Sequence, residues 1–162
     1  MEMENTTKQM ESKNLHKNRV HKVLAHSYIF YFVSFLFGLL LDFVFPFIIF
    51  ENVAILWIGF IFLIFGTFLI VWAQKSSHKL VKEGMNKDTF CNGPYCYTRI
   101  PTHYGLFFLM FGFGILSNAL FIIIFSIISF FITKFVFIKK EEEILTLKYG
   151  TPYIEYKKLV KF

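Results

Sequence analysis

Charged side chains are scarce in this sequence, and its long apolar runs contain almost none. Asp, Glu, Lys and Arg make up 17% of the 162 residues, whereas hydrophobic residues make up 56% and include 24 phenylalanines. That apolar fraction exceeds what an ordinary soluble domain carries. The composition therefore excludes a typical soluble fold and predicts an integral membrane protein.

The N-terminal arm lacks the features of a cleaved signal peptide. Residues 1–26 are polar and contain no apolar segment that closes on a small-residue cleavage site. We therefore predict a polar cytoplasmic arm at 1–26 and a single membrane domain at 27–162. His16, His21 and His26 recur in the arm at five-residue spacing, which does not align them on one helix face. They are predicted to be scattered solvent histidines rather than a metal site.

Cysteine is also rare, with only Cys91 and Cys96. A zinc site needs further Cys or His ligands at fixed spacing, and these are missing, so no metal is predicted. Because both cysteines are expected to face the reducing cytoplasm, we predict that they do not form a structural disulfide.

Four apolar runs are candidates for membrane helices, since about 20 apolar residues cross a bilayer core about 30 Å thick. They cover residues 27–45, 54–73, 103–116 and 119–138. The third run is short, and only Ser117 and Asn118 separate it from the fourth. We predict an all-α, polytopic membrane protein with about four transmembrane helices, a C-terminal helical hairpin and a cytoplasmic tail helix.

Lys and Arg are absent from the loops at one end of these predicted helices, around Asn52 and Asn118. They gather instead in the N-terminal arm, in the loop at 74–102 and in the tail. The positive-inside rule then places both termini and that loop in the cytoplasm. The rule, together with attraction to anionic lipid, explains the net charge of +6, so nucleic-acid binding is not predicted. Asp42, the one acid inside an apolar run, is expected near the outer interface in a structural role.

Polar and aromatic side chains gather where the third run begins. Residues 93–105 read GPYCYTRIPTHYG, and the fourth run ends in KKEEE at 139–143. Because a hairpin returns the chain to its starting side, the two clusters can frame one cytoplasmic pocket. Pro101 suits the first turn of a helix, whose N-terminal amides are a natural place for a ligand carboxylate. The alternatives are an interfacial belt of tyrosines, an Arg99 that faces lipid phosphate, and a solvated run of glutamates.

The order and spacing of these clusters resemble those of the integral-membrane methyltransferases that include isoprenylcysteine carboxyl methyltransferase and the phospholipid N-methyltransferases. In that family G-P-Y-x-Y-x-R-H-P-x-Y-x-G precedes a helical hairpin, and E-E-x-x-L-x-x-x-F-G-x-x-Y-x-x-Y-x-x-x-V follows it. Here residues 93–105 and 141–160 stand in these places, so the resemblance covers about 70 residues. Ile100 and His103 stand where the family has histidine and tyrosine.

The resemblance implies S-adenosyl-L-methionine (SAM) as methyl donor, bound in a cofactor-binding part at about 87–162. It also implies a lipophilic small-molecule or lipidated acceptor that enters from the bilayer. The implied cofactor contacts are Asp88, Thr89, Phe90, Tyr95, Ile100, Pro101, Thr102, His103, Tyr104, Glu141 and Glu142. The chemistry of the donor agrees, because aromatic faces suit a sulfonium, a glutamate suits an ammonium, and Arg99 suits a carboxylate.

Arg99 and His103 are the candidate catalytic residues. We favour carboxyl methylation of an isoprenylcysteine-like acceptor, because a carboxylate with a reference pKa of about 4 is already deprotonated at neutral pH. Lys134, Lys139 and Lys140 would attract such an anion. The alternative, N-methylation of a phospholipid ethanolamine, needs a base, which His103 could supply. A non-catalytic membrane adaptor with the same fold stays open, whereas a transporter is disfavoured because the apolar runs offer no charged pathway.

Overall fold

The computed structural model describes residues 25–52, 54–80 and 91–160, and the regular structure in these ranges is entirely helical. The elements are a first helix, Ala25–Val44, followed by α2 (Ala54–Leu80), a short 3-10 turn η1 (Gly93–Cys96), α4 (Pro101–Leu116), α5 (Leu120–Ile132), a π-helical segment η2 (Thr133–Phe137), α6 (Ile138–Tyr149) and α7 (Thr151–Leu159). The prediction of an all-α fold is confirmed.

Three of the helices are long and apolar enough to cross a membrane: Ala25–Val44, Ala54–Ser77 and Leu120–Leu147. The helix Pro101–Leu116 is apolar but shorter. Large side chains such as Phe32, Trp57 and Phe65 are exposed on the outside of the bundle. Exposed apolar side chains in such numbers suit contact with lipid rather than with water.

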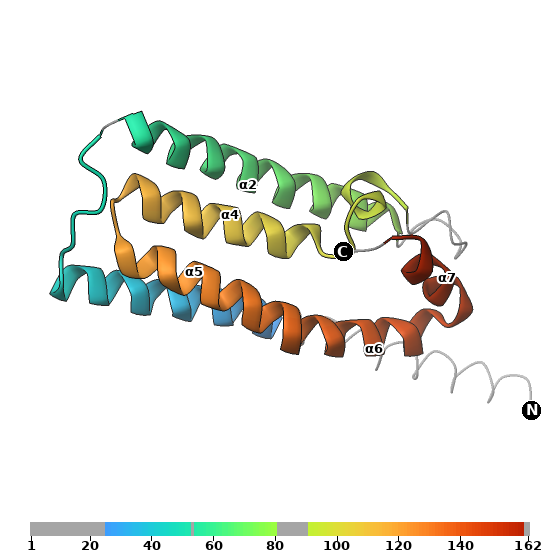
Figure 1. The fold of residues 1–162 in the computed structure, drawn as a ribbon. Coiled ribbons are helices and arrows are strands. Elements are labelled where there is room, and N and C mark those ends of the chain that lie inside the picture. The colour runs from blue at the N-terminus through green and yellow to red at the C-terminus, as the bar shows by residue number, and fades with distance from the viewer. Residues whose placement is uncertain (1–24, 53, 81–90, 161–162) are drawn as a thin grey trace, which may run out of the picture.

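Paired glycines let α2 and α4 approach closely, and Figure 1 shows these two helices running side by side. A Cβ atom added to Gly66 would lie 2.8 Å from the carbonyl oxygen of Gly105. One added to Gly59 would lie 2.8 Å from the carbonyl oxygen of Gly112. No larger residue fits at either crossing without moving backbone, so small residues set the spacing of this pair, as is common in membrane bundles.

The Asn118 side chain, between α4 and α5, hydrogen-bonds to the extended stretch that joins the first helix to α2. Its Oδ1 accepts hydrogen bonds from the amides of Ile49 and Phe50, at 3.0 and 2.9 Å, and its Nδ2 donates to the Phe50 carbonyl at 3.0 Å. Asn118 has a φ of 53°, a conformation that Asn tolerates better than most residues. The two loops at this end of the bundle are therefore joined.

Asp42, near the end of the first helix, caps the start of α5. Its two carboxylate oxygens accept hydrogen bonds from the amides of Phe121 (3.0 Å) and Ile122 (2.9 Å). The first amides of a helix have no partner within the helix, and a carboxylate there also opposes the positive end of the helix dipole. The expected structural role of Asp42 is confirmed.

The C-terminal part of the chain turns back over one end of the bundle. The chain continues from α5 through η2 into α6, and Figure 1 shows α7 folded back toward the start of α4. The reversal occurs at Gly150, whose φ of 64° favours glycine. Tyr153, Tyr156 and Val160 then form a buried cluster that holds α7 in place.

Candidate active site

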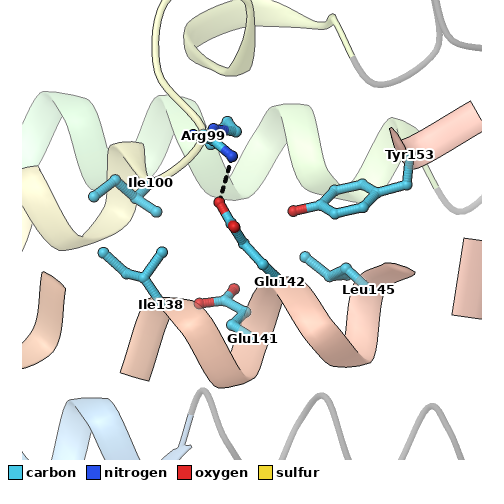
Figure 2. Close-up of a pocket in the computed structure, with 7 residues that line it drawn as sticks. All are labelled: Arg99, Ile100, Ile138, Glu141, Glu142, Leu145 and Tyr153. Carbon is cyan, nitrogen blue, oxygen red and sulfur yellow. Dashed lines mark hydrogen bonds and ion pairs between the residues drawn. The ribbon is translucent and has the colours of Figure 1, made fainter. Parts of the chain in front are cut away.

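The two sequence clusters meet at the end of the bundle where α4 begins. Arg99, in the turn before α4, forms an ion pair with Glu142 of α6, with 2.5 Å between Nη1 and Oε1 (Figure 2). The two residues are 43 positions apart, and their side chains are 7% and 12% exposed. Because an unpaired charge is unfavourable when buried, each holds the other in place.

Glu142 also contacts the tail helix. Its second oxygen, Oε2, lies 2.5 Å from Nζ of Lys157 in α7, a lysine whose side chain is 44% exposed. Glu142 therefore joins the turn before α4, helix α6 and helix α7. The two protein cations balance the charge of Glu142, so this carboxylate is poorly suited to bind a cation of a ligand.

A small pocket lies beside this ion pair, shown in Figure 2. It has a volume of about 10 Å³, enough for about one water molecule, and it opens to solvent. Its lining comes from the turn before α4, from α6 and from α7. The lining residues are Arg99, Ile100, Ile138, Glu141, Glu142, Leu145 and Tyr153.

Glu141 is the second carboxylate of this pocket. Within the described ranges of the chain, no Lys, Arg or His pairs with it, in contrast to Glu142. The phenols of Tyr28 and Tyr95 lie close enough to interact electrostatically with the Glu141 carboxylate. A partly buried carboxylate near aromatic rings is suited to a ligand that carries an ammonium group.

Tyrosines position the η1 turn against the tail. The Tyr156 hydroxyl donates a 2.7 Å hydrogen bond to the Tyr95 carbonyl, and the Tyr95 phenol interacts with the Thr102 hydroxyl at the start of α4. Burial raises the pKa of Tyr95, Tyr153 and Tyr156 above the usual value, so all three phenols stay neutral at physiological pH.

The start of α4 offers fewer free amides than the sequence suggested. Pro101 is the first helical residue, as predicted, and it is buried. The amides of His103 and Tyr104, however, both donate to the Ile100 carbonyl, at 3.1 and 3.3 Å. A ligand carboxylate would have to bind Arg99 or the amides of this turn that do not donate to the Ile100 carbonyl.

His103 lies in the first turn of α4, where it is buried, and it is not part of the pocket lining. It is 2% exposed, and its Nε2 has no hydrogen-bond partner among the described residues. The neighbouring Tyr104 ring packs against Phe130, with 5.3 Å between centroids. The structure thus separates the predicted base from the carboxylates. The remaining predicted contacts, Asp88, Thr89 and Phe90, lie outside the described residues.

The prediction that the cysteines stay unpaired is wrong, because Cys91 and Cys96 form a disulfide. The η1 turn between them brings their Cα atoms to 4.4 Å, within the range that a disulfide spans. The turn signal Gly93-Pro94 lies between the two cysteines and could have indicated this closeness.

Lys157, Tyr153 and Tyr156 belong to the site but were not among its predicted residues. All three lie in α7, whose return over the pocket depends on the reversal at Gly150. The two tyrosines stand at positions of the second family motif, so their spacing was the available signal. No cluster of His, Cys, Asp and Glu suited to a metal ion occurs within the described parts of the chain.

Comparison of the chain with known protein families, with curated proteins and with solved structures finds no match.

Proposed function

We propose that the chain is an integral-membrane methyltransferase that transfers a methyl group from SAM to a lipophilic acceptor. The observation that carries the proposal is the pocket between the two motifs, in which the Glu141 carboxylate pairs with no cation of the described residues. SAM carries an ammonium group that such a carboxylate can bind. The resemblance in 93–105 and 141–160 supplies the reaction class.

The lining residues suggest how the donor would lie. Glu141 would hold the ammonium, and Tyr153, the aromatic residue of the lining, would lie nearest to the sulfonium. Arg99 would share its guanidinium between Glu142 and the donor carboxylate. The pocket, with about 10 Å³ of enclosed space, is far smaller than the roughly 300–1,000 Å³ of typical small-molecule sites, so side chains at its mouth would have to move to admit the donor.

We propose a four-span arrangement with the pocket on the cytoplasmic side. Three helices meet the length for a span, and α4 would be the fourth. Its 16 residues reach about 24 Å at 1.5 Å per residue, which is short of a full bilayer core. The basic residues at the pocket end support the cytoplasmic placement. The Cys91–Cys96 disulfide at the same end is unusual for a reducing compartment, so the cytoplasmic placement rests on the distribution of Lys and Arg alone.

The favoured acceptor is a carboxylate on an isoprenylcysteine-like lipophile. Lys139 and Lys140 are exposed at the pocket end of α6 and would attract an anion. The second candidate is N-methylation of a phospholipid amine. It needs a base, because an ammonium must lose a proton before it can attack. His103, whose Nε2 has no hydrogen-bond partner among the described residues, is the candidate, and it would have to reach the acceptor from outside the pocket lining.

Equilibrium binding of SAM to the purified protein tests the donor site. Glu141→Ala should weaken binding by roughly 2–5 kcal/mol, the range for removing one side of a buried charge pair. Glu143→Ala is the matched control, because Glu143 is the exposed neighbour on the same helix. Equal effects of the two substitutions, or no SAM binding at all, would contradict the proposal and favour a non-catalytic adaptor.

The acceptor class is tested with labelled SAM and each acceptor in turn, followed by mild base. A methyl ester releases volatile methanol, whereas an N-methyl group stays attached. We expect base-labile label on the prenylated carboxylate. Base-stable label on a phospholipid would overturn the carboxylate assignment, and His103→Ala should then abolish transfer while SAM still binds.

A further inference from the structure

Four polar atoms buried within the helix bundle have no hydrogen-bond partner among the described residues. They are the Tyr31 hydroxyl on the first helix, Nε2 of His103 on α4, the Ser129 hydroxyl on α5 and the Thr133 hydroxyl at the start of η2. Their residues are at most 4% exposed. We call this set the polar seam. It lies deeper in the bundle than the pocket, which none of its members lines.

The members of the polar seam lie on helices that face one another. Tyr31 packs in one apolar cluster with Met110 of α4, and His103 stands two turns before Met110 on the same face. Ser129 and Thr133 are four residues apart and so share a face of their helix. The hydroxyls of Tyr31 and Thr133 are close enough to interact, but neither completes a hydrogen bond of good geometry.

The helix is irregular where the polar seam crosses it. Thr133 begins the π-helical segment η2, and the Ile138 amide donates to the Thr133 carbonyl, one residue farther than in an α-helix. Single π turns within helices are rare and occur frequently at functional sites. The irregularity coincides with a fully buried threonine whose hydroxyl completes no hydrogen bond of good geometry among the described residues.

In a bilayer, each unsatisfied polar group is unfavourable by several kcal/mol, because no bulk water replaces a missing partner. Four buried groups on facing helices complete no hydrogen bond with the described residues, although Tyr31 and Thr133 lie close enough to interact, and this indicates a further partner. The groups are hydroxyls and an imidazole rather than carboxylates or ammonium groups, so a charged partner would lack a counter-ion. A hydroxyl fits, because it can both donate and accept.

We propose that the polar seam binds the uncharged, hydroxyl-bearing head of a membrane amphiphile. Leu106, Met110 and Phe125, which belong to or pack against the apolar cluster that contains Tyr31, would provide apolar contacts for the first part of its chain. This inference rests on the membrane placement proposed above but not on methyl transfer.

The probe is a long-chain alcohol that carries a photoreactive group, applied to the full chain in detergent micelles. Labelling should be saturable, should map to the first helix and α5, and should be displaced by dodecanol in preference to dodecylamine. Tyr31→Phe and Thr133→Val each remove one hydroxyl with little change of shape. Each should weaken labelling roughly three- to ten-fold, as expected for one hydrogen bond.

Ser126→Ala is the matched control. Ser126 is as deeply buried, but its hydroxyl already donates a 2.7 Å hydrogen bond to the Ile123 carbonyl, so labelling should not change. Circular dichroism checks that each variant is folded, and Ser129→Ala takes the place of any variant that is not. Unchanged labelling of the folded variants would overturn the proposal, as would labelling that does not saturate. SAM binding, measured on the same samples, reports on the donor site separately.

Discussion

Glu142 is the residue on which three segments of the candidate site converge. Breaking a buried ion pair by removing one partner destabilises a protein by roughly 3–5 kcal/mol. The Arg99 side should contribute most, because Lys157 is 44% exposed and solvent screens that interaction. We therefore expect Glu142→Ala to lower the melting temperature clearly, measured by circular dichroism in detergent.

The neighbouring Glu143→Ala should leave that melting temperature almost unchanged, since Glu143 is exposed and pairs with no described residue. If the two variants melted together, the Arg99–Glu142 pair would contribute nothing to stability, and the assembly of the site would have to depend on the tyrosine contacts of α7.

The disulfide between Cys91 and Cys96 should also stabilise the fold. Cys91 and Cys96 are five residues apart, and chain entropy gives a ring of this size about 2 kcal/mol of stabilisation. Reduction with dithiothreitol should lower the melting temperature. The double variant Cys91→Ser/Cys96→Ser should melt at the lower temperature with or without reductant. A wild-type protein that mass spectrometry shows to be fully reduced, yet that melts unchanged, would contradict this.

The close packing of α2 against α4 should depend on the glycines at their crossing. Gly66→Leu places a side chain where even a Cβ would lie 2.8 Å from the Gly105 carbonyl oxygen. Forcing the helices apart should destabilise the fold by about 1–3 kcal/mol or more. The control is Thr67→Leu, one residue along, where the side chain is exposed and the same leucine meets no helix. Thermal unfolding of the two variants compares them directly, and equal melting temperatures would rule out the close crossing.

The sequence predicted the helices well where apolarity defines them and less well where it does not. The second apolar run stops at 73, but α2 continues to Leu80 because a helix needs backbone hydrogen bonds rather than apolar side chains. The fourth run was likewise expected to end at 138, where α6 in fact begins. The π-helical segment between α5 and α6 had no signal in the sequence.

The π-helical segment η2 is also the reason why the sequence could not predict which glutamate pairs with Arg99. An α-helix that gains one residue in a π turn rotates all that follows by about 100°, which decides whether Glu141, Glu142 or Glu143 faces Arg99. The spacing of the motifs indicated that the α4 and α6 clusters meet. It could not indicate that Glu142 is the paired glutamate, or that α7 returns Lys157 to it.

At the scale of the whole molecule, the two loops far from the pocket should report the same side of a membrane. Asn118 hydrogen-bonds the stretch at Ile49 and Phe50, so those loops lie together. Glycosylation or protease tags at Asn52 and Asn118 should both be detected opposite to tags at the two termini, because Lys and Arg gather at the other end. A cytoplasmic signal from position 118 would contradict the four-span arrangement.

Asp42 and the amides that it caps are synthesised far apart in time. The carboxylate precedes Phe121 by 79 residues and Ile122 by 80. A ribosome that adds roughly 5–20 residues per second takes about 4 to 16 seconds to cover that distance. During this interval the carboxylate has no helix end to bind, and an unpaired charge does not settle into lipid. We therefore expect the first helix to wait near the membrane surface during translation and to reach its final depth only when α5 emerges.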